Sequence, residues 1–249
     1  MCVERYDKYK STVTDAGLRK GYLLMHIDQF KEQIGVLENA YYAKPEGNPI
    51  LGISVAHPVA KSIEEYIMPF LASRKINEYV FAWKAGTLAK ENENKEDEKY
   101  IIKEMDGAYL TVYGTKIEKK ALHDYLGRVS KAVVVGDDFE PIYNSLIKLN
   151  PPHNFGAVYM INLLFFLSGG EWPIYDRFAH KAAKALFMEK HPNQIYVGPA
   201  PSKEKEADVV NMYSEYIWFL EKLFGNKSIG RKIDRALWVY GHASGEYCL

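Results

Sequence analysis

The segment AVYMINLLFFL, residues 157–167, constrains the fold more than any other part of the sequence. As a helix it is apolar on nearly every side, with Asn162 as the exception. A helix that is hydrophobic all round needs other elements packed against every face. We therefore expect this helix in the middle of a core, with both of its flanking turns held rigidly.

The rest of the sequence predicts a mainly α-helical protein, because apolar residues recur at helical spacing on both sides of this core helix. The predicted helices cover 13–43, a segment after Pro58, 117–131, 139–149, 175–188, a long helix from near Ser202, and 231–242. A short apolar segment, 79–84, stops at Gly86. Pro69 is expected to bend or end the helix that contains it.

The sequence also predicts one small β-hairpin. In YIIKEMDGAYLTVYG, two β-rich runs flank Asp106-Gly107, a strong hairpin signal that places the hairpin at about 100–114. The preceding charge run ENENKEDEKY is expected to be a solvated loop. A soft division therefore falls near residue 115, between an N-terminal helical region with the hairpin (1–115) and a second helical region (116–249). The alternative is one two-lobed domain in which the first helix packs against the second half.

Composition narrows the function. The chain has 249 residues, 47% hydrophobic and 26% charged, as in globular proteins. Its formal net charge is zero, so it lacks the overall basic balance of many nucleic-acid-binding proteins, although a local basic face remains compatible with neutrality. It contains no P-loop, Gly-rich dinucleotide loop, G-x-S-x-G elbow or H-E-x-x-H motif. We therefore expect no cofactor.

Neither a metal site nor a membrane segment is predicted. Cys2 and Cys248 have no Cys or His nearby at metal-ligand spacing, and no two of the seven histidines pair at helical metal spacing. The polar N-terminus has no apolar signal region. The longest apolar stretch is shorter than the roughly 20 residues that cross a bilayer. We expect a cytoplasmic protein without a membrane partner.

The turns on either side of the 157–167 helix hold the candidate site. The turn NPPHNFG, residues 150–156, leaves the amides at the helix N-terminus exposed, and such amides suit a phosphate. After the helix, GGEWP leads to Asp176 at the start of the next predicted helix. An aspartate at this position either caps the helix or supplies a carboxylate to a reaction.

This order of elements resembles the helix-hairpin-helix DNA glycosylase superfamily. The stretch FGAVYMINLLFFLSGGEWPIYDRFAHKAAKAL, with AWKAG and DRALWVYG, is similar to uncharacterised bacterial proteins with an oxoguanine-glycosylase-like fold. The resemblance covers about 140–186 and, more weakly, the last helix. It implies a glycosylase-like helical bundle with one small β-hairpin, a role in DNA repair, DNA as the partner, and Asp176 as the catalytic residue.

The resemblance also implies how DNA would be held, because the family hairpin grips the DNA backbone. The residues placed at the backbone are Asn154, Phe155, Gly156, Arg177 and Lys181. The aromatic residues placed to stack on a base are Trp172 and Tyr175. The alternative for the two aromatic residues is core packing. The alternative for the polar residues of the 175–188 helix is a solvated face made by Arg177, His180, Lys181 and Lys184.

The chain departs from the family pattern in two places. The family turn usually reads Leu-Pro-Gly-x-Gly, whereas residues 150–156 keep one glycine, Gly156. Lyase-type members carry a lysine early in the second helix, whereas residues 156–159 read GAVY, so a Schiff-base mechanism has no nucleophile. These features leave two functions open: monofunctional base excision assisted by Asp176, or a non-catalytic module that binds nucleic acid or a protein partner.

Overall fold

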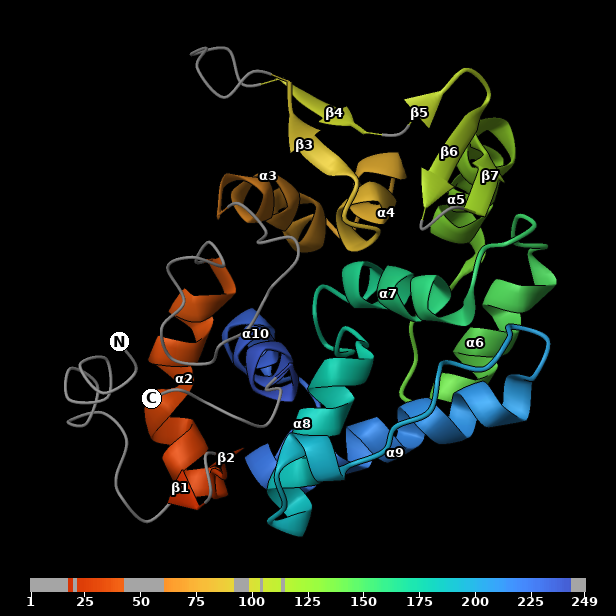
Figure 1. The fold of residues 1–249 in the computed structure, drawn as a ribbon. Helices are drawn as coiled ribbons and strands as arrows, with labels where there is room; N and C mark the ends of the chain where they lie inside the picture. The colour runs from red at the N-terminus through yellow and green to blue at the C-terminus, as the bar shows by residue number, and fades with distance from the viewer. Residues whose placement is uncertain are drawn as a thin grey trace. The chain divides into compact units, whose positions relative to one another are not determined.

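A computed structural model describes residues 18–19, 22–42, 61–91, 99–103, 105–112 and 115–242 of the chain (Figure 1). The described chain is mainly helical, with small antiparallel sheets, as the sequence predicts. Most of the charge run and both cysteines lie outside the described residues.

The chain forms two compact units, each assembled from separated segments. The first unit comprises Met1–Pro58, Tyr175–Pro199 and Glu215–Leu249, and the second comprises Val59–Ile174 and Ala200–Ser214. The division expected from the sequence, in contrast, falls at a single point near residue 115.

The second unit is organised around helix α7 (Ala157–Leu167), which begins and ends where the sequence predicts. Helices α3 (Lys61–Ala72), α4 (Glu78–Lys84) and α6 (Phe139–Lys148) pack against it (Figure 1). The fully buried side chains of α7 are Met160, Ile161, Leu164 and Phe166. The prediction of a helix in the middle of a core is confirmed.

Helices α3 and α4 follow their sequence signals. Asn77 caps α4, its side-chain oxygen accepting a hydrogen bond from the backbone N–H of Val80 at 3.1 Å. Past its end, Gly86 has φ +71°, a conformation that glycine adopts without strain. Pro69 does not end α3 at once, because the helix continues to Ala72.

The second unit contains more β-structure than expected. The predicted hairpin is present as β5 (Met105–Asp106) and β6 (Tyr109–Val112). A third strand, β7 (Thr115–Glu118), extends this sheet, and β3 (Leu88–Lys90) pairs with β4 (Tyr100–Ile102) in another.

Helix α5 (Lys119–Ala132) therefore begins later than the predicted start at Ile117. Ile117 is buried in β7, opposite Leu110 of β6. Strand pairing with β6 outweighs the helical periodicity that the sequence shows at residues 117–118.

The first unit is built from α2 (Ile27–Tyr42), α8 (Arg177–Met188), α10 (Gly230–Gly241) and the end of α9 (Glu206–Phe224). Helix α10 packs against both α2 and α8, and the short 3₁₀ turn η3 (Pro192–Gln194) lies against α8 (Figure 1).

The predicted first helix, 13–43, is wrong in its N-terminal part. Helix α2 begins at Ile27, and the strands β1 (Leu18–Arg19) and β2 (Tyr22–Leu23) pair before it. Gly21 stands in the sequence between these strands, and glycine weakens a helix interior while favouring a tight hairpin turn.

An ion pair joins α10 to α2, because Arg235 pairs with Glu38. Within α10 itself, Arg231 pairs with Asp234 one turn later. The hydroxyl of Tyr240 accepts a hydrogen bond from the backbone N–H of Met25 at 3.0 Å, and burial raises the pKa of Tyr240 to about 12. These polar contacts are buried among apolar residues, so each group needs its partner.

Helices α8 and α10 approach each other so closely that only glycine fits at the crossing. A Cβ atom added at Gly241 would lie 1.9 Å from the backbone oxygen of Phe178. Because the obstacle is backbone rather than the end of a flexible side chain, any larger residue forces the helices apart.

We expect Gly241→Ala to destabilise the protein by about 1–3 kcal/mol, as overpacking does in a closely packed interior. Urea denaturation measures the free energy of unfolding. Gly35→Ala is the matched control: Gly35 lies within α2, and an added Cβ meets nothing within 4 Å. It should stabilise by roughly 0.5–1 kcal/mol. Equal effects of the two substitutions would contradict the close approach.

Candidate functional site

The predicted site residues are divided between the two units. The second unit contains the turn 150–156 and Trp172, and the first contains Tyr175, Asp176, Arg177 and Lys181. Each group is therefore considered within its own unit.

Asp176 is the N-cap of α8. Its backbone is extended, with φ −143° and ψ 138°, and its Oδ1 accepts a hydrogen bond from the backbone N–H of Phe178 at 2.8 Å. Its carbonyl accepts the first helical hydrogen bond, from the N–H of His180 at 2.9 Å. The side chain is half-buried. The geometry is that of a capping aspartate, which satisfies an otherwise unpaired helical amide.

Behind this cap, α8 carries a polar cluster that the sequence did not reveal, in which buried His180 meets the exposed Glu215. His180 is 1% exposed, so its expected place on a solvated helix face is wrong. Its Nδ1 lies 3.2 Å from the hydroxyl of Tyr175, and its Nε2 lies 3.2 Å from Oε2 of Glu215. Lys184 donates to the other oxygen of Glu215 at 2.7 Å.

The surroundings of His180 and Tyr175 favour the neutral form of both side chains. Burial lowers the pKa of His180 to about 4, although the carboxylate of Glu215 opposes the shift. Burial, followed by the charges of Asp176 and Glu215, raises the pKa of Tyr175. A neutral imidazole accepts a hydrogen bond from the tyrosine hydroxyl at Nδ1 and keeps its own proton on Nε2, facing the carboxylate.

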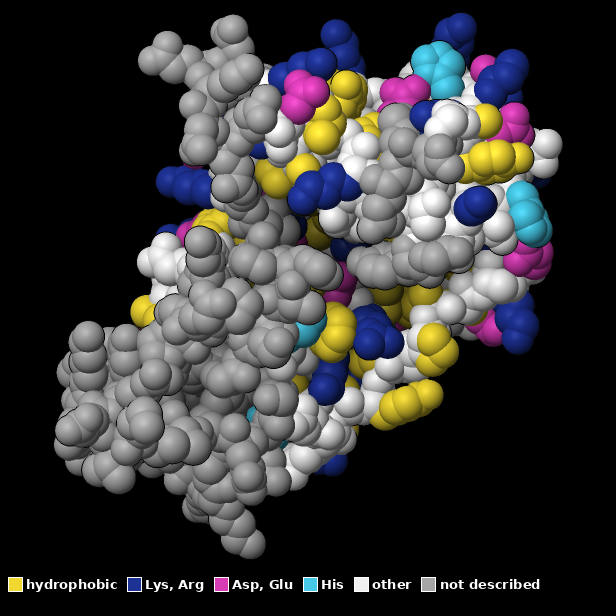
Figure 2. Space-filling model, turned by 45° about the horizontal axis from the view of Figure 1, so that its top comes forward, with side chains coloured by type: hydrophobic (Ala, Val, Ile, Leu, Met, Phe, Trp, Pro, Cys, Tyr) yellow, Lys and Arg dark blue, Asp and Glu magenta, His cyan; other side chains and the backbone are white. Residues whose placement is uncertain are grey.

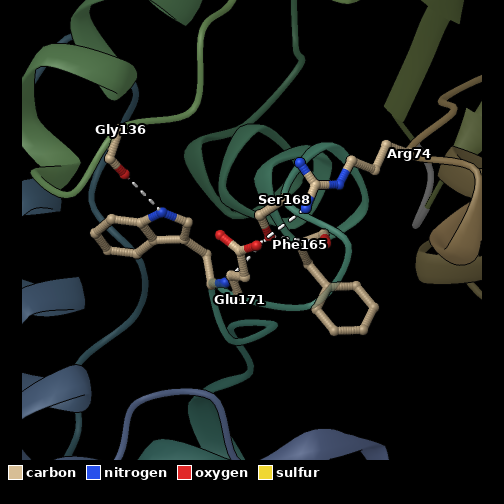
Figure 3. Close-up of polar contacts among 6 residues, drawn as sticks. Arg74, Gly136, Phe165, Ser168 and Glu171 are labelled. Atoms are coloured by element: carbon tan, nitrogen blue, oxygen red, sulfur yellow. Dashed lines mark hydrogen bonds and ion pairs between the residues drawn. The ribbon is translucent and has the colours of Figure 1, made fainter.

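Trp172 is held by the rigid turn after α7 (Figure 3). Its indole N–H donates to the carbonyl of Gly136 at 3.1 Å, and its backbone N–H donates to Oγ of Ser168, also at 3.1 Å. Outside these contacts, Arg74 forms an ion pair with Glu171 at 3.0 Å. The turn expected to be rigid is thus fixed by side-chain hydrogen bonds on both sides.

Neither aromatic residue predicted to stack on a base presents a face to solvent. Trp172 is 3% exposed and Tyr175 is 1% exposed. Trp172 lies near the rings of Phe139 and Tyr213, with centroids 6.1 and 6.2 Å away. This burial matches the core-packing alternative. Base stacking by either ring would require it to leave its packed position, and it stays a prediction.

In the turn 150–156, asparagine residues take the left-handed positions. Asn150 and Asn154 adopt the left-handed conformation, with φ +56° and +66°, which asparagine tolerates better than most residues. The side-chain amide of Asn154 donates to the carbonyl of Lys116 at 3.2 Å. Phe155 is fully buried and stacks on Phe81. Of the turn residues predicted to meet a phosphate, Phe155 is therefore an anchor in the core.

Two cations are fixed against the same turn. Lys203 donates to the carbonyl of Pro152 at 2.8 Å. Arg128 donates through Nε to the carbonyl of Leu149 at 3.2 Å and through Nη2 to that of Asn150 at 3.3 Å. Gly156 is the N-cap of α7 and has no side chain to satisfy the amides of its first turn. Sequence reasoning missed both cations, because they come from segments distant in the chain.

Elsewhere on the surface the charges are mixed. On the face shown in Figure 2, Lys and Arg side chains lie among acidic, polar and hydrophobic ones. The described residues contain no group of three or more His, Cys, Asp or Glu that could hold a metal ion. None of the helices in the described ranges is long and apolar enough to cross a membrane.

No family model, curated protein or solved structure matches the chain.

We expect Asp176→Ala to cost about 0.5–2 kcal/mol of stability, because the amide of Phe178 loses its acceptor. Asp176→Asn should change stability little, since asparagine caps helices as well as aspartate does. Thermal or urea unfolding of the three proteins measures both effects. Equal losses for the two variants would show that charge, rather than the cap hydrogen bond, stabilises α8.

Stability should fall as the pH drops from about 6.5 towards 4. The pKa values of His180 and His191 are both lowered to about 4, mainly by burial, whereas histidines in the unfolded chain protonate near 6.5. Between these pH values the two histidines become protonated in the unfolded state but stay mostly neutral in the folded state, so proton binding favours unfolding. Urea unfolding across the pH range measures the slope.

His180→Asn is the variant for this test, because its amide places a polar atom near the position of Nδ1 without titrating. Its stability should depend less steeply on pH between 6.5 and 4 than that of the wild type. An unchanged slope would mean that His180 does not contribute to the acid sensitivity.

Proposed function

We propose that the chain is a nucleic-acid-binding protein that acts without catalysis, and that the turn 150–156 with the N-terminus of α7 contacts the phosphate backbone. The observation that supports this most directly is the anchoring of Arg128 and Lys203 on the carbonyls of that turn. These contacts hold both charges on the turn that leads into α7. A cation and a helix N-terminus each favour an anion.

The hydrogen bonds that fix these cations leave donors for a ligand. An ammonium has three N–H groups and a guanidinium has five, and the contacts to the turn use one and two of them. Arg128 is exposed and Lys203 is half-buried. A phosphate could therefore be met by groups whose positions are already set, which limits the entropy lost on binding.

The non-catalytic form of the proposal follows from what Asp176 and its neighbours do. The carboxylate caps α8, and the rings of Trp172 and Tyr175 are packed in the interior. A glycosylase instead needs a pocket that takes up a flipped base beside its carboxylate. The formal net charge of zero leads us to expect weak, salt-sensitive binding.

We expect the wild type to bind single- or double-stranded DNA at low salt, with an affinity that falls steeply as salt rises. Lys203→Gln should weaken binding and reduce the slope of log K against log salt by about 0.7–0.9, the effect of one lost phosphate contact. Fluorescence anisotropy of a labelled oligonucleotide measures both quantities. Lys131→Gln is the matched control, because Lys131 is an exposed lysine on α5.

Two outcomes would overturn the proposal. Absence of binding at low salt would remove nucleic acid as the partner. Release of a base from a panel of damaged DNAs by the wild type, lost in Asp176→Asn, would replace it with monofunctional base excision, since the variant keeps the cap but loses the charge.

A further inference from the structure

The first turn of α8 and the last turn of α10 form a continuous stack of planar groups. The guanidinium carbon of Arg177 lies 4.7 Å from the ring centroid of Phe178. The Phe178 ring stacks on the imidazole of His242, with centroids 3.5 Å apart and planes at 27°. Trp238 lies against the imidazole at a tilt, with centroids 3.8 Å apart and planes at 44°. We call these four residues the Arg177 stack; all belong to the first unit.

The stack is accessible at its cationic end. Arg177 is exposed, whereas the three rings are half-buried. The guanidinium of Arg177 lies over the Phe178 ring, so a planar cation beside an aromatic ring is accessible at the start of α8. A planar cation on an aromatic ring is a surface on which a nucleic-acid base stacks well.

Hydrogen bonding fixes the imidazole in the middle of the stack. Nδ1 of His242 lies 2.8 Å from the carbonyl oxygen of Trp238, and because a carbonyl only accepts, Nδ1 carries the proton. The neutral ring therefore presents Nε2 as an acceptor. Burial lowers the pKa of His242, so the neutral form persists to lower pH than in an ordinary histidine.

Positive charge gathers around the stack. Lys181 lies one helical turn after Arg177, and burial and the charge of Arg177 together lower its pKa. Arg177 and Lys181 also act on His242 in the direction that lowers its pKa, against the opposite effect of Asp176. The cations are thus within electrostatic range of one another, and an anion placed between them would relieve their repulsion.

We propose that the Arg177 stack binds a base of single-stranded nucleic acid, with the base lying on the exposed guanidinium of Arg177 and an adjacent phosphate meeting Lys181. The inference rests on the proposed function and adds to it a second contact, in the other unit, that reads bases rather than backbone. It assigns base stacking to residues other than Trp172 and Tyr175, which are buried.

The combination of a planar cation with aromatic rings favours a single-stranded ligand. Charge alone would suit any polyanion, including a duplex or an acidic peptide. A flat cation at the end of an aromatic stack gains from the π-face of an unpaired base, which a duplex keeps inside its own stack. The stack therefore predicts a difference between strands that carry bases and strands that do not.

The test compares a labelled oligothymidylate with an abasic strand of the same length, by fluorescence anisotropy at low salt. Arg177→Lys keeps the charge but removes the planar group. It should weaken binding of the oligothymidylate roughly threefold and leave binding of the abasic strand unchanged. Lys181→Gln should weaken both strands alike, because it removes a phosphate contact.

Lys190→Ala is the control for the loss of an exposed positive charge in the same unit, because Lys190 is exposed just past the end of α8. It should change neither affinity. Circular dichroism of each variant verifies that the helices are retained.

The outcomes separate the two proposals. If Arg177→Lys leaves the oligothymidylate affinity unchanged while Lys203→Gln lowers it, the stack inference is wrong and the proposed function stands. Equal losses for both strands in Arg177→Lys would mean that Arg177 acts only on the backbone, which also overturns the inference. If the wild type binds neither strand, the stack inference falls; if it also binds no duplex at low salt, the proposed function falls with it.

Discussion

In the second unit, the packing of the neighbouring elements depends on one requirement: α7 must be shielded from water on every side. Full burial of one large aliphatic or aromatic side chain is worth about 1.5–3 kcal/mol, and α7 buries such side chains around its whole circumference. No single neighbour can cover a helix of this kind, so α3, α4 and α6 must all pack against it. The two turns that flank α7 are then fixed by what the helix requires, before any ligand is considered.

In this protein, the positions of individual charges matter more than the net charge, and hydrogen bonds to the backbone set those positions. The net charge is zero, and acidic and basic side chains mix on the surface. Arg128 and Lys203 nevertheless stand at defined positions because they donate hydrogen bonds to backbone carbonyls at the turn. A neutral protein with a few fixed cations would bind a polyanion weakly but in one orientation, because contacts to phosphate position a ligand without reading its sequence.

The sequence predicted the elements whose pattern is local and strong. Helix α7 and the hairpin at Asp106-Gly107 follow from an unbroken apolar run and from a turn dipeptide, and both are present. Strand β7 was not predicted, because it is stabilised by pairing with β6, and the periodicity within 117–131 gives no information about that pairing.

The candidate site was also predictable only in part, because contacts between segments far apart in the chain leave no local sequence pattern. The N-cap position of Asp176 is a local property of GGEWPIYD and was among the alternatives considered. The burial of His180 depends on Glu215 and Tyr216, more than one helix away in the chain. The cations on the turn 150–156 and the Arg177 stack likewise join segments far apart in sequence, and no spacing rule connects them.

The glycine at the crossing of α8 and α10 has a consequence for axial register. A shift of α10 by one residue moves it about 1.5 Å along its axis and turns it by about 100°. It brings Tyr240 or His242, each with a Cβ, towards the backbone oxygen of Phe178, where only Gly241 fits. Such a shift is therefore excluded, and the alignment that remains sets the contact between the rings of Phe178 and His242.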